Sequence, residues 1–250
     1  MDIVVRDRVA AGIPLLELCR ADDGKRPLVL LYHGYLGRKE FILAQAYYLA
    51  AQGFFVVAPD AFAHGGRAVP GDALSQPSAA GFIECVTRTS AEINTLLESC
   101  ADDARADVGR VGLAGYSMGG CITFDYLMGS DRRVTAAASV IGSPDWVSVM
   151  RAASAQGLLP DTPEDIAARV RVTHPAARED GFTPLPLLML AGTADTLVPP
   201  EGVKGFYERN LSRYEQPERL CLKLYDNVGH NDTVEMNMEL AQWMTRYLHD

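Results

Sequence analysis

Short runs of consecutive apolar residues alternate along the chain with longer segments in which apolar residues recur every three or four positions. The short runs read as buried strands, at 27–34, 54–60, 110–117, 134–143, 184–192 and 219–226. The longer segments have helical spacing, at 41–53, 78–99, 118–129, about 200–212 and 232–248. Nearly all-apolar strands separated by helices predict a parallel sheet with helices on both faces, which is an α/β fold.

Two segments depart from this alternation. Residues 2–20 contain two β-like runs with no helix between them, so we expect an antiparallel pair at an edge of the sheet. The segment from about Pro144 to Thr183 holds several prolines and Trp146, and it lies between two predicted strands. It predicts a small helical cap insertion over the strand ends, at about 144–183, within one domain that spans residues 1–250.

The overall composition is that of an ordinary globular protein, and it limits the class of partner. Of the 250 residues, 48% are hydrophobic and 22% are charged, which suits a single α/β domain with a sizeable core. The formal net charge is −9, with acidic residues scattered along the chain. Such a chain has no electrostatic reason to bind nucleic acid or an anionic membrane surface, so we expect neither partner.

The cysteines and the first residues bear on the cellular compartment. The five cysteines are odd in number, widely spread and without a C-x-x-C pair, at positions 19, 85, 100, 121 and 221. This pattern predicts neither a disulfide framework nor a zinc site. The chain shows no signal-peptide pattern at its start, and no uncharged apolar run reaches the roughly 18 residues of a membrane span. We expect a cytoplasmic protein.

The candidate nucleophile is Ser117. The sequence GYSMG at 115–119 matches the G-x-S-x-G pattern of a nucleophile elbow. A serine on such a strand-to-helix turn adopts strained backbone angles, and side chains two residues before and after it would collide with neighbouring backbone. A glycine-rich turn with a solvated serine would carry the same letters. The strand-like residues before the motif and the helix-like residues after it favour a catalytic serine at a helix N-terminus.

Serine is a poor nucleophile without a base, and in this kind of fold the base comes last in the order serine, acid, histidine. Three histidines follow the motif, namely His174, His230 and His249. His249 is the penultimate residue, where fraying would spoil its position, and His174 lies in the predicted cap. His230 follows a predicted strand on a short loop and precedes a predicted helix. We therefore assign His230 as the base.

The acid that orients the histidine has two candidates. Asp195 lies on a loop after the apolar run that ends at 192, separated from it by a glycine turn. Asp145 also follows a predicted strand and is the second candidate. Either aspartate could instead be a turn residue that caps a helix. The surroundings favour Asp195.

Acyl transfer also needs hydrogen-bond donors for the oxyanion. One should be the backbone N–H of Met118, directly after the serine, and the other should come from the loop that follows an early strand. The loop at 32–37 fits, with the N–H of Tyr35 as the donor. His33 precedes the serine and belongs to this loop, so we interpret it as structural. His64 lies at another strand end, where we expect it to pack a loop rather than line the entrance.

These motifs together resemble the α/β-hydrolase superfamily. They are H-G-Y, PDAFAHG, GYSMGG, GTADTLVP and GH, they occur in the family's order, and the resemblance spans about residues 28–248. More narrowly, the chain resembles small bacterial carboxylesterases of the branch that contains dienelactone hydrolases and acyl-peptidases. Dienelactone hydrolases carry cysteine at the elbow where this chain has serine, which argues against dienelactone hydrolysis itself. The peptidases of the branch usually have a large extra domain, for which this chain leaves no room.

The resemblance implies an α/β-hydrolase fold with an eight-stranded, mostly parallel sheet. It implies Ser117 as nucleophile, Asp195 as the orienting acid and His230 as general acid and base. It also implies that Tyr35 and Met118 donate to the oxyanion through their backbone N–H groups. No metal or organic cofactor is implied.

The function expected from these residues is that of a serine carboxylesterase acting through an acyl-enzyme on a small-molecule ester. The bulky Tyr35, Trp146 and Met118 indicate a small apolar acyl pocket and hence short-chain esters, and Tyr116 and Trp146 are the candidate substrate-binding residues. A thioesterase or a small serine peptidase would use the same residues. A ligand-binding protein on the same fold is a third reading, against which the intact serine, aspartate and histidine count. The oligomeric state is not predicted.

Overall fold

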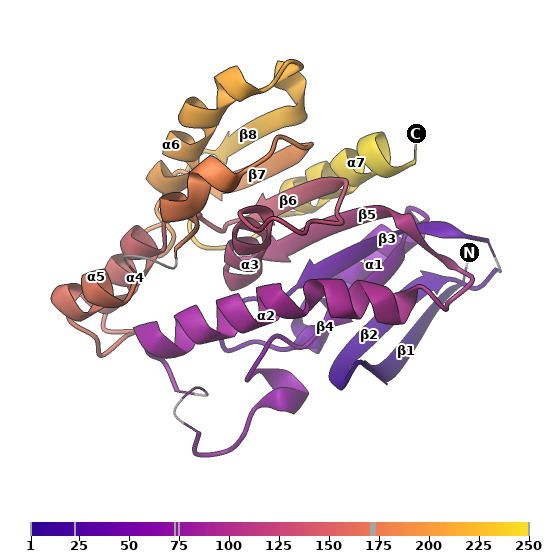
Figure 1. The fold of residues 1–250 in the computed structure, drawn as a ribbon, viewed down its shortest axis with the longest axis horizontal. Helices are drawn as coiled ribbons and strands as arrows, with labels where there is room; N and C mark the ends of the chain where they lie inside the picture. The colour runs from indigo at the N-terminus through magenta and orange to yellow at the C-terminus, as the bar shows by residue number, and fades with distance from the viewer. Residues whose placement is uncertain (1, 23, 73, 75, 171–173, 250) are drawn as a thin grey trace.

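A computed structural model describes residues 2–249 apart from 23, 73, 75 and 171–173 (Figure 1). Within these residues eight strands form one sheet in the order β1-β2-β4-β3-β5-β6-β7-β8. Their bounds are β1 Ile3–Ala10, β2 Ile13–Arg20, β3 Arg26–Tyr32, β4 Phe55–Pro59, β5 Ala106–Tyr116, β6 Ala136–Val140, β7 Leu187–Gly192 and β8 Leu220–Tyr225. The strands from β4 to β8 in this order pair in parallel, whereas β2 is antiparallel to both β1 and β4. The predicted α/β fold and the antiparallel edge pair are confirmed.

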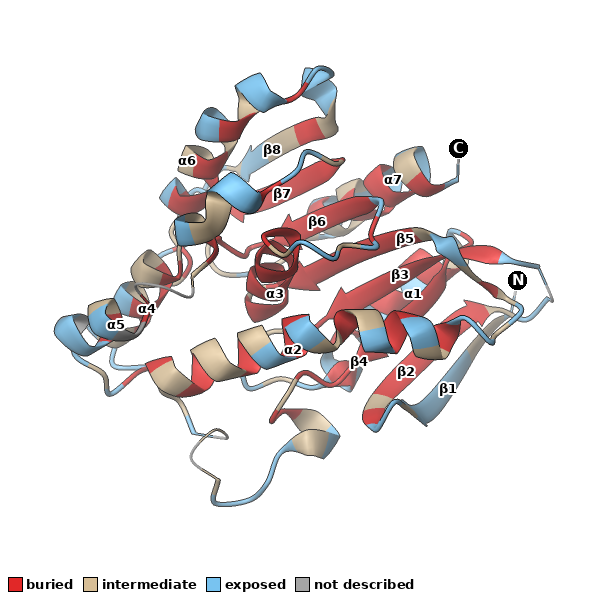
Figure 2. Ribbon diagram, in the orientation of Figure 1, coloured by how far each residue is buried: buried red, intermediate tan, exposed pale blue. Residues whose placement is uncertain are grey.

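Helices cover both faces of the sheet. They are α1 Leu43–Ala51, α2 Ala79–Cys100, α3 Met118–Leu127, α4 Trp146–Ala155, α5 Pro163–Val170, α6 Glu201–Asn210 and α7 Val234–Leu248. Short 3-10 turns are η1 Lys39–Ile42, η2 Gly65–Arg67, η4 Pro175–Gly181, η5 Leu211–Arg213 and η6 Pro217–Arg219. One buried cluster lies under α2, α3, α4 and α6, and a second lies under α1 and α7. The central strands between these layers are buried along most of their length (Figure 2).

Burial on two faces explains why the central strands appear in the sequence as unbroken apolar runs. In β3, Leu28 and Leu30 belong to the cluster on the α2 side, and Val29 and Leu31 belong to the cluster on the α1 side. Successive side chains of a strand point to opposite faces, so both sets must be apolar when both faces are covered. Every residue of β3 is buried.

The boundaries differ from the predicted ones at a few elements. Strand β5 begins at Ala106 rather than 110, because Ala106 and Asp107 pair with the start of β3 although residues 107–110 are exposed or partly exposed. Strand β6 ends at Val140, because Ile141 has a left-handed φ of 48° that turns the chain out of the sheet. The helical segment predicted from 41 begins as the 3-10 turn η1 before α1.

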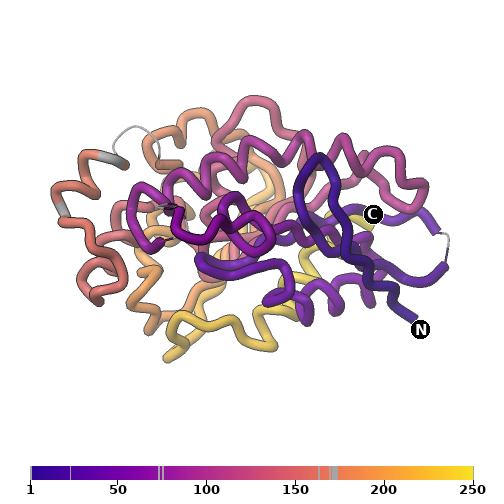
Figure 3. The backbone as a smooth tube through the Cα atoms, turned by 90° about the horizontal axis from the view of Figure 1, so that it is seen from below, coloured from indigo at the N-terminus to yellow at the C-terminus, as the bar shows by residue number. Residues whose placement is uncertain are grey.

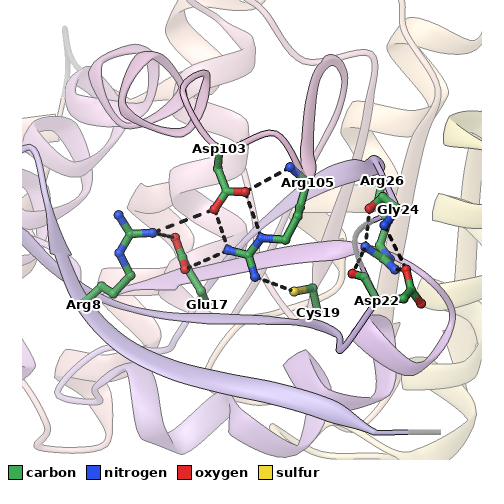
Figure 4. A network of polar contacts seen from close by, with 8 residues as sticks. All are labelled: Arg8, Glu17, Cys19, Asp22, Gly24, Arg26, Asp103 and Arg105. Atoms are coloured by element: carbon green, nitrogen blue, oxygen red, sulfur yellow. Dashed lines mark hydrogen bonds and ion pairs between the residues drawn. The ribbon is translucent and has the colours of Figure 1, made fainter.

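A network of ion pairs ties the N-terminal hairpin to the loop that precedes β5 (Figure 4). Glu17 on β2 accepts from Arg8 at 2.5 Å and lies 3.8 Å from Arg105. Arg105 donates to Asp103 at 2.5 Å and to the Cys19 sulfur at 3.3 Å. The hydrogen bond from Arg105 holds the pKa of Asp103 at about 2, below its usual range. The network lies at the opposite end of β5 from Ser117, so it supports the sheet edge rather than the candidate site.

The segment predicted as a cap folds into α4, α5 and η4 between β6 and β7. Figure 3 shows this segment at one end of the molecule, although residues 171–173 lie outside the described residues. Asp161 accepts a hydrogen bond from the N–H of Ala79 at 2.8 Å, which anchors the segment to the start of α2. Glu179 accepts from Arg209 at 2.8 Å and anchors it to α6. Its function as a cap stays a prediction.

Candidate active site

Ser117 lies between the end of β5 and the start of α3 on a sharp turn, with φ 56° and ψ −113°. Its N–H donates to the carbonyl oxygen of Val140 at 2.9 Å. A Cβ on Gly115 would lie 2.2 Å from the carbonyl carbon of Gly119, and a Cβ on Gly119 would lie 2.3 Å from the carbonyl oxygen of Tyr32. Both distances are too short for any side chain, so the expected collision of side chains with neighbouring backbone is confirmed.

A chain of hydrogen bonds joins Ser117, His230 and Asp195. The Ser117 hydroxyl donates to Nε2 of His230 at 2.8 Å, and Nδ1–H of His230 donates to Oδ2 of Asp195 at 2.8 Å. The other carboxylate oxygen of Asp195 accepts from the N–H groups of Leu197 at 3.0 Å and Val198 at 2.8 Å. Because a carboxylate only accepts, the histidine proton sits on Nδ1, and Nε2 presents a lone pair to the serine.

The side chains of Asp195 and His230 differ in their exposure to solvent, in a way that suits proton transfer. The Asp195 side chain is fully buried, whereas the His230 side chain is 22% exposed. The loops that carry the two residues run against each other: the N–H of Thr193 donates to Tyr225 at 2.9 Å, and the N–H of Ala194 donates to Val228 at 3.0 Å. The aspartate and histidine are therefore fixed relative to each other by backbone as well as by their own hydrogen bond.

The loop after β3 passes beside the serine. A Cβ on Gly34 would lie 3.5 Å from the Cβ of Ser117. The carbonyl oxygen of Gly34 accepts from Nδ1–H of His33 at 2.8 Å and from the N–H of Gly37 at 3.1 Å. Since C=O and N–H of a trans peptide point in opposite directions, these two bonds turn the N–H of Tyr35 away from His33 and Gly37. The N–H of Tyr35 therefore takes part in neither of the two hydrogen bonds that form the turn at residues 34–37.

His33 is neutral and structural in this arrangement. Its Nε2 accepts from the N–H of Ala61 at 3.1 Å, so both ring nitrogens are used within the loops. The side chain is fully buried, and burial lowers the pKa of His33 to about 4. His64 packs beside it, with ring centroids 5.5 Å apart, and donates from Nδ1 to the carbonyl oxygen of Phe62 at 2.8 Å. Burial also lowers the pKa of His64.

Asp60 is a buried residue of the site region whose hydrogen-bond partners the sequence alone does not reveal. Its buried carboxylate accepts from the N–H of Lys39 and from the N–H of Gly66, both at 2.8 Å, and it lies 3.8 Å from the Lys39 ammonium. It thus joins the loop after β3 to the loop after β4. The sequence does carry a signal for this role, because Asp60 directly follows a buried strand and precedes a pair of glycines. An aspartate in such a position commonly accepts hydrogen bonds from the N–H groups of a turn.

The other candidates for the acid and the base lie away from the hydrogen-bond chain of Ser117, His230 and Asp195. Asp145 caps the N-terminus of α4, where it accepts from the N–H of Ser148 at 3.2 Å and from its hydroxyl at 2.6 Å. His249 ends α7 and packs on the ring of Phe54 at 4.6 Å. His174 precedes η4, and its backbone N–H donates to the carbonyl oxygen of Val170 at 3.2 Å. The structure brings neither Asp145 nor these two histidines into the hydrogen-bond chain of Ser117.

The two candidate substrate-binding residues fall on opposite faces of the sheet. Trp146 is fully buried and meets Phe82 edge-on at 6.1 Å, and Phe82 in turn meets Tyr35 edge-on at 5.4 Å. Tyr116 belongs instead to the cluster under α1 and α7, where its hydroxyl donates to Oδ1 of Asn237. A substrate-binding role for Tyr116 stays a prediction, although its strand position directs the side chain away from the aromatic group around Trp146.

The arrangement of these motifs agrees with the comparison to known families. A sequence model of the dienelactone hydrolase family matches residues 17–239. The chain belongs to the dienelactone hydrolase family. The Bacillus subtilis (strain 168) protein that carries the name "Putative esterase YitV" is 32% identical over 98% of this chain and 100% of its own length. Membership and this relative support an enzyme that hydrolyses esters.

Solved structures show the same fold as this member of the dienelactone hydrolase family. TT1662 from Thermus thermophilus has a TM-score of 0.80 and 24% identity, over 100% of both chains. The acylaminoacyl peptidase of Pyrococcus horikoshii has a TM-score of 0.72 and 16% identity, over 99% of this chain and 40% of that one. The resemblance to the α/β-hydrolase fold and to its dienelactone-hydrolase and acyl-peptidase branch is confirmed.

Among the residues that the structure describes, no three histidine, cysteine or carboxylate side chains come together as a metal site. In the same part of the chain, no helix combines the length and the apolar character needed to cross a membrane.

Proposed function

We propose that the protein is a serine carboxylesterase that hydrolyses small, short-chain esters through an acyl-enzyme intermediate. The observation that carries the proposal is the hydrogen-bond chain from Ser117 through His230 to Asp195, at 2.8 Å for each step. Membership of the dienelactone hydrolase family supports ester hydrolysis. A cytoplasmic location stays a prediction.

The first half of the reaction forms the acyl-enzyme. Nε2 of His230 takes the proton from the Ser117 hydroxyl as its oxygen attacks the ester carbonyl carbon. Asp195 holds the imidazole in the tautomer with Nδ1–H and stabilises the imidazolium that forms. The imidazolium then gives its proton to the leaving alkoxide oxygen, and the C–O bond breaks to release the alcohol.

The second half returns the enzyme to its starting state. His230 removes a proton from a water molecule, whose oxygen attacks the acyl carbon bound to Ser117. The proton then passes from His230 to the serine oxygen, and the carboxylic acid leaves. The partial exposure of His230 supports this step, because water must reach Nε2.

The backbone N–H groups of Met118 and Tyr35 are proposed to stabilise the oxyanion in both halves. The first hydrogen bond of α3 runs from the N–H of Cys121 to the carbonyl oxygen of Ser117, so the N–H of Met118 lies before the helical ladder. The bonds that His33 and Gly37 make to Gly34 support the orientation of the Tyr35 N–H. One such donor is worth about 10²–10³ in kcat in other serine hydrolases.

The preference for short acyl chains is proposed from a row of aromatic side chains that begins at Tyr35, on the loop that passes beside the serine. Trp146, Phe82 and Tyr35 form consecutive edge contacts, and Met118 belongs to the same buried cluster. Tightly packed aromatic rings leave little space for an acyl chain unless one of them moves. Trp146 is therefore the proposed substrate-binding residue.

The decisive experiment compares hydrolysis of p-nitrophenyl acetate, butyrate and octanoate by wild type, Ser117→Ala and Ser99→Ala. Ser99 is the matched control, since its hydroxyl donates to the carbonyl oxygen of Leu96 within α2. We expect wild type and Ser99→Ala to hydrolyse the short esters and Ser117→Ala to fall to background. If none of the three proteins hydrolyses any of the esters, a thioesterase, a peptidase or a ligand-binding protein becomes the favoured function. Equal activity of Ser117→Ala would exclude Ser117 as the nucleophile.

A further inference from the structure

A line of hydrogen-bonded side chains runs behind the candidate active site, on the α1 and α7 side of the sheet. The Tyr116 hydroxyl donates to Oδ1 of Asn237, and Nδ2 of Asn237 donates to Oδ2 of Asp232 at 3.0 Å. Nε2 of Gln45 on α1 donates to the same Asp232 oxygen at 3.0 Å. The described partners of Asp232 therefore come from two different helices.

The chemistry of these side chains fixes which group donates and which accepts in each hydrogen bond of the line. The Asp232 carboxylate only accepts, so Asn237 must turn its amide nitrogen toward it and its amide oxygen toward Tyr116. Tyr116 must then be the donor. Its hydroxyl stays protonated, because burial and the negative charge of Asp232 raise the pKa of Tyr116 well above its usual range.

The two ends of the line lie next to the two reacting residues. Tyr116 directly precedes Ser117 in the chain, and Asp232 comes two residues after His230. The backbone of β5 and α3 fixes Ser117. The histidine loop is held on its N-terminal side where Val228 accepts from Ala194 at 3.0 Å. On its C-terminal side, Asp232 supplies the bonds to Gln45 and Asn237.

We propose that Tyr116, Asn237 and Asp232 act as a positioning clamp that sets the distance between the Ser117 hydroxyl and Nε2 of His230. The clamp rests on the proposed function, because it concerns the proton transfer between these two atoms. It acts through His230 and does not touch the substrate. Errors of about 1 Å in such a geometry can lower a rate by about 10²-fold.

Tyr116→Phe removes one hydroxyl and is the first test. Its matched control is Tyr126→Phe, since Tyr126 on α3 is about as buried and its hydroxyl also donates to an asparagine oxygen, that of Asn94, at 2.7 Å. The Tyr126 hydroxyl additionally accepts from the N–H of Arg133 at 2.8 Å. We expect Tyr116→Phe to lower kcat for the best ester by about 10-fold with KM unchanged. Tyr126→Phe should keep both constants within about twofold, while the two variants lose similar thermal stability. Equal kinetic effects of the two variants would overturn the clamp.

The acidic end of the clamp allows a rescue test. Asp232→Ala leaves the amides of Asn237 and Gln45 without an acceptor and should lower kcat about as much as Tyr116→Phe. Asp232→Asn keeps an amide oxygen that can accept from both, and we expect it to restore most of the rate. An Asp232→Ala enzyme with the kcat of wild type would contradict the proposal.

A spectroscopic readout separates the clamp from the proposed function. The Nδ1–H of His230 should give a downfield proton NMR signal, assigned by its loss in His230→Gln. We expect this proton to exchange with water at least several-fold faster in Tyr116→Phe and at the wild-type rate in Tyr126→Phe. This result would support the clamp even if the wild type hydrolysed no ester, in which case only the proposed function would fail. Unchanged exchange in Tyr116→Phe would overturn the clamp whatever the esterase assay shows.

Discussion

Gly115 and Gly119 lie in backbone contact across the turn that carries Ser117, so close that a Cβ on Gly115 would fall 2.2 Å from the carbonyl carbon of Gly119. The end of β5 and the first turn of α3 therefore touch without any side chain between them. The positive φ of Ser117 depends on this contact, because a wider turn would let the serine relax to ordinary backbone angles.

Gly115→Ala should destabilise the protein by at least about 3 kcal/mol, because backbone atoms rather than flexible side chains meet the new methyl group. The control is Gly109→Ala on the same strand, where the nearest contact is the end of the Asp107 side chain at 3.3 Å. Urea unfolding of both variants measures the difference. Similar free energies of unfolding for the two variants would show that the elbow has room to open.

Asp195→Asn should lower kcat by about 10⁴-fold while the thermal unfolding midpoint changes by only a few degrees. The amide oxygen can keep the hydrogen bonds from Leu197 and Val198, which turns the amide nitrogen toward His230. That donor faces Nδ1 and forces the proton of the imidazole onto Nε2, so His230 can no longer accept from Ser117. Measurements of ester hydrolysis and of thermal unfolding check the expected loss of kcat and the small change in the unfolding midpoint. Retained kcat would remove Asp195 from the mechanism.

Unfolding should depend on pH through His33. Its folded-state pKa of about 4 lies below the ordinary value of 6.5, so as the pH falls from 6.5 to 4 the unfolded chain takes up a proton that the folded protein does not. Stability from this group is present above pH 6.5 and falls by about 3 kcal/mol by pH 4. His33→Gln removes the titration, so its free energy of unfolding should fall less over this range. Parallel curves for the two proteins would contradict the prediction.

Trp146→Leu should widen the acyl pocket and raise the rate on p-nitrophenyl octanoate relative to acetate, at a cost of about 2–3 kcal/mol in stability. The control is the other tryptophan, because Trp243 on α7 is also buried but lies in the cluster on the opposite face of the sheet. Trp243→Leu should lose similar stability and keep the chain-length profile. A profile that is unchanged in Trp146→Leu would exclude Trp146 from the acyl pocket.

The elements and the order of the chemical motifs could be predicted because their causes are local. A strand buried on both faces must be apolar at every position, as β3 is, and the elbow must have glycine where Gly115 and Gly119 meet backbone. The start of β5 could not be predicted in the same way. Residues 106–110 do not form an apolar run, and the strand starts there because Ala106 and Asp107 pair with the first residues of β3.

Contacts between distant segments left no local signal. Gln45 and Asp232 are 187 residues apart, and Tyr116 and Asn237 are 121 residues apart. The letter Y within G-x-S-x-G does not say on which face of the sheet the side chain lies. The pleat of β5 decides that Tyr116 points toward α7 and not toward Trp146.

The sequence by itself determined the α/β class, the strained turn at Ser117 and a short set of histidines and aspartates that could serve it, because propensity and steric demand act between neighbours in the chain. Only the tertiary structure decided which of them meet. It placed Asp195 rather than Asp145 against His230, and it made Asp60 a link between loops. These choices depend on how helices and strands pack, and packing is set by the whole chain at once.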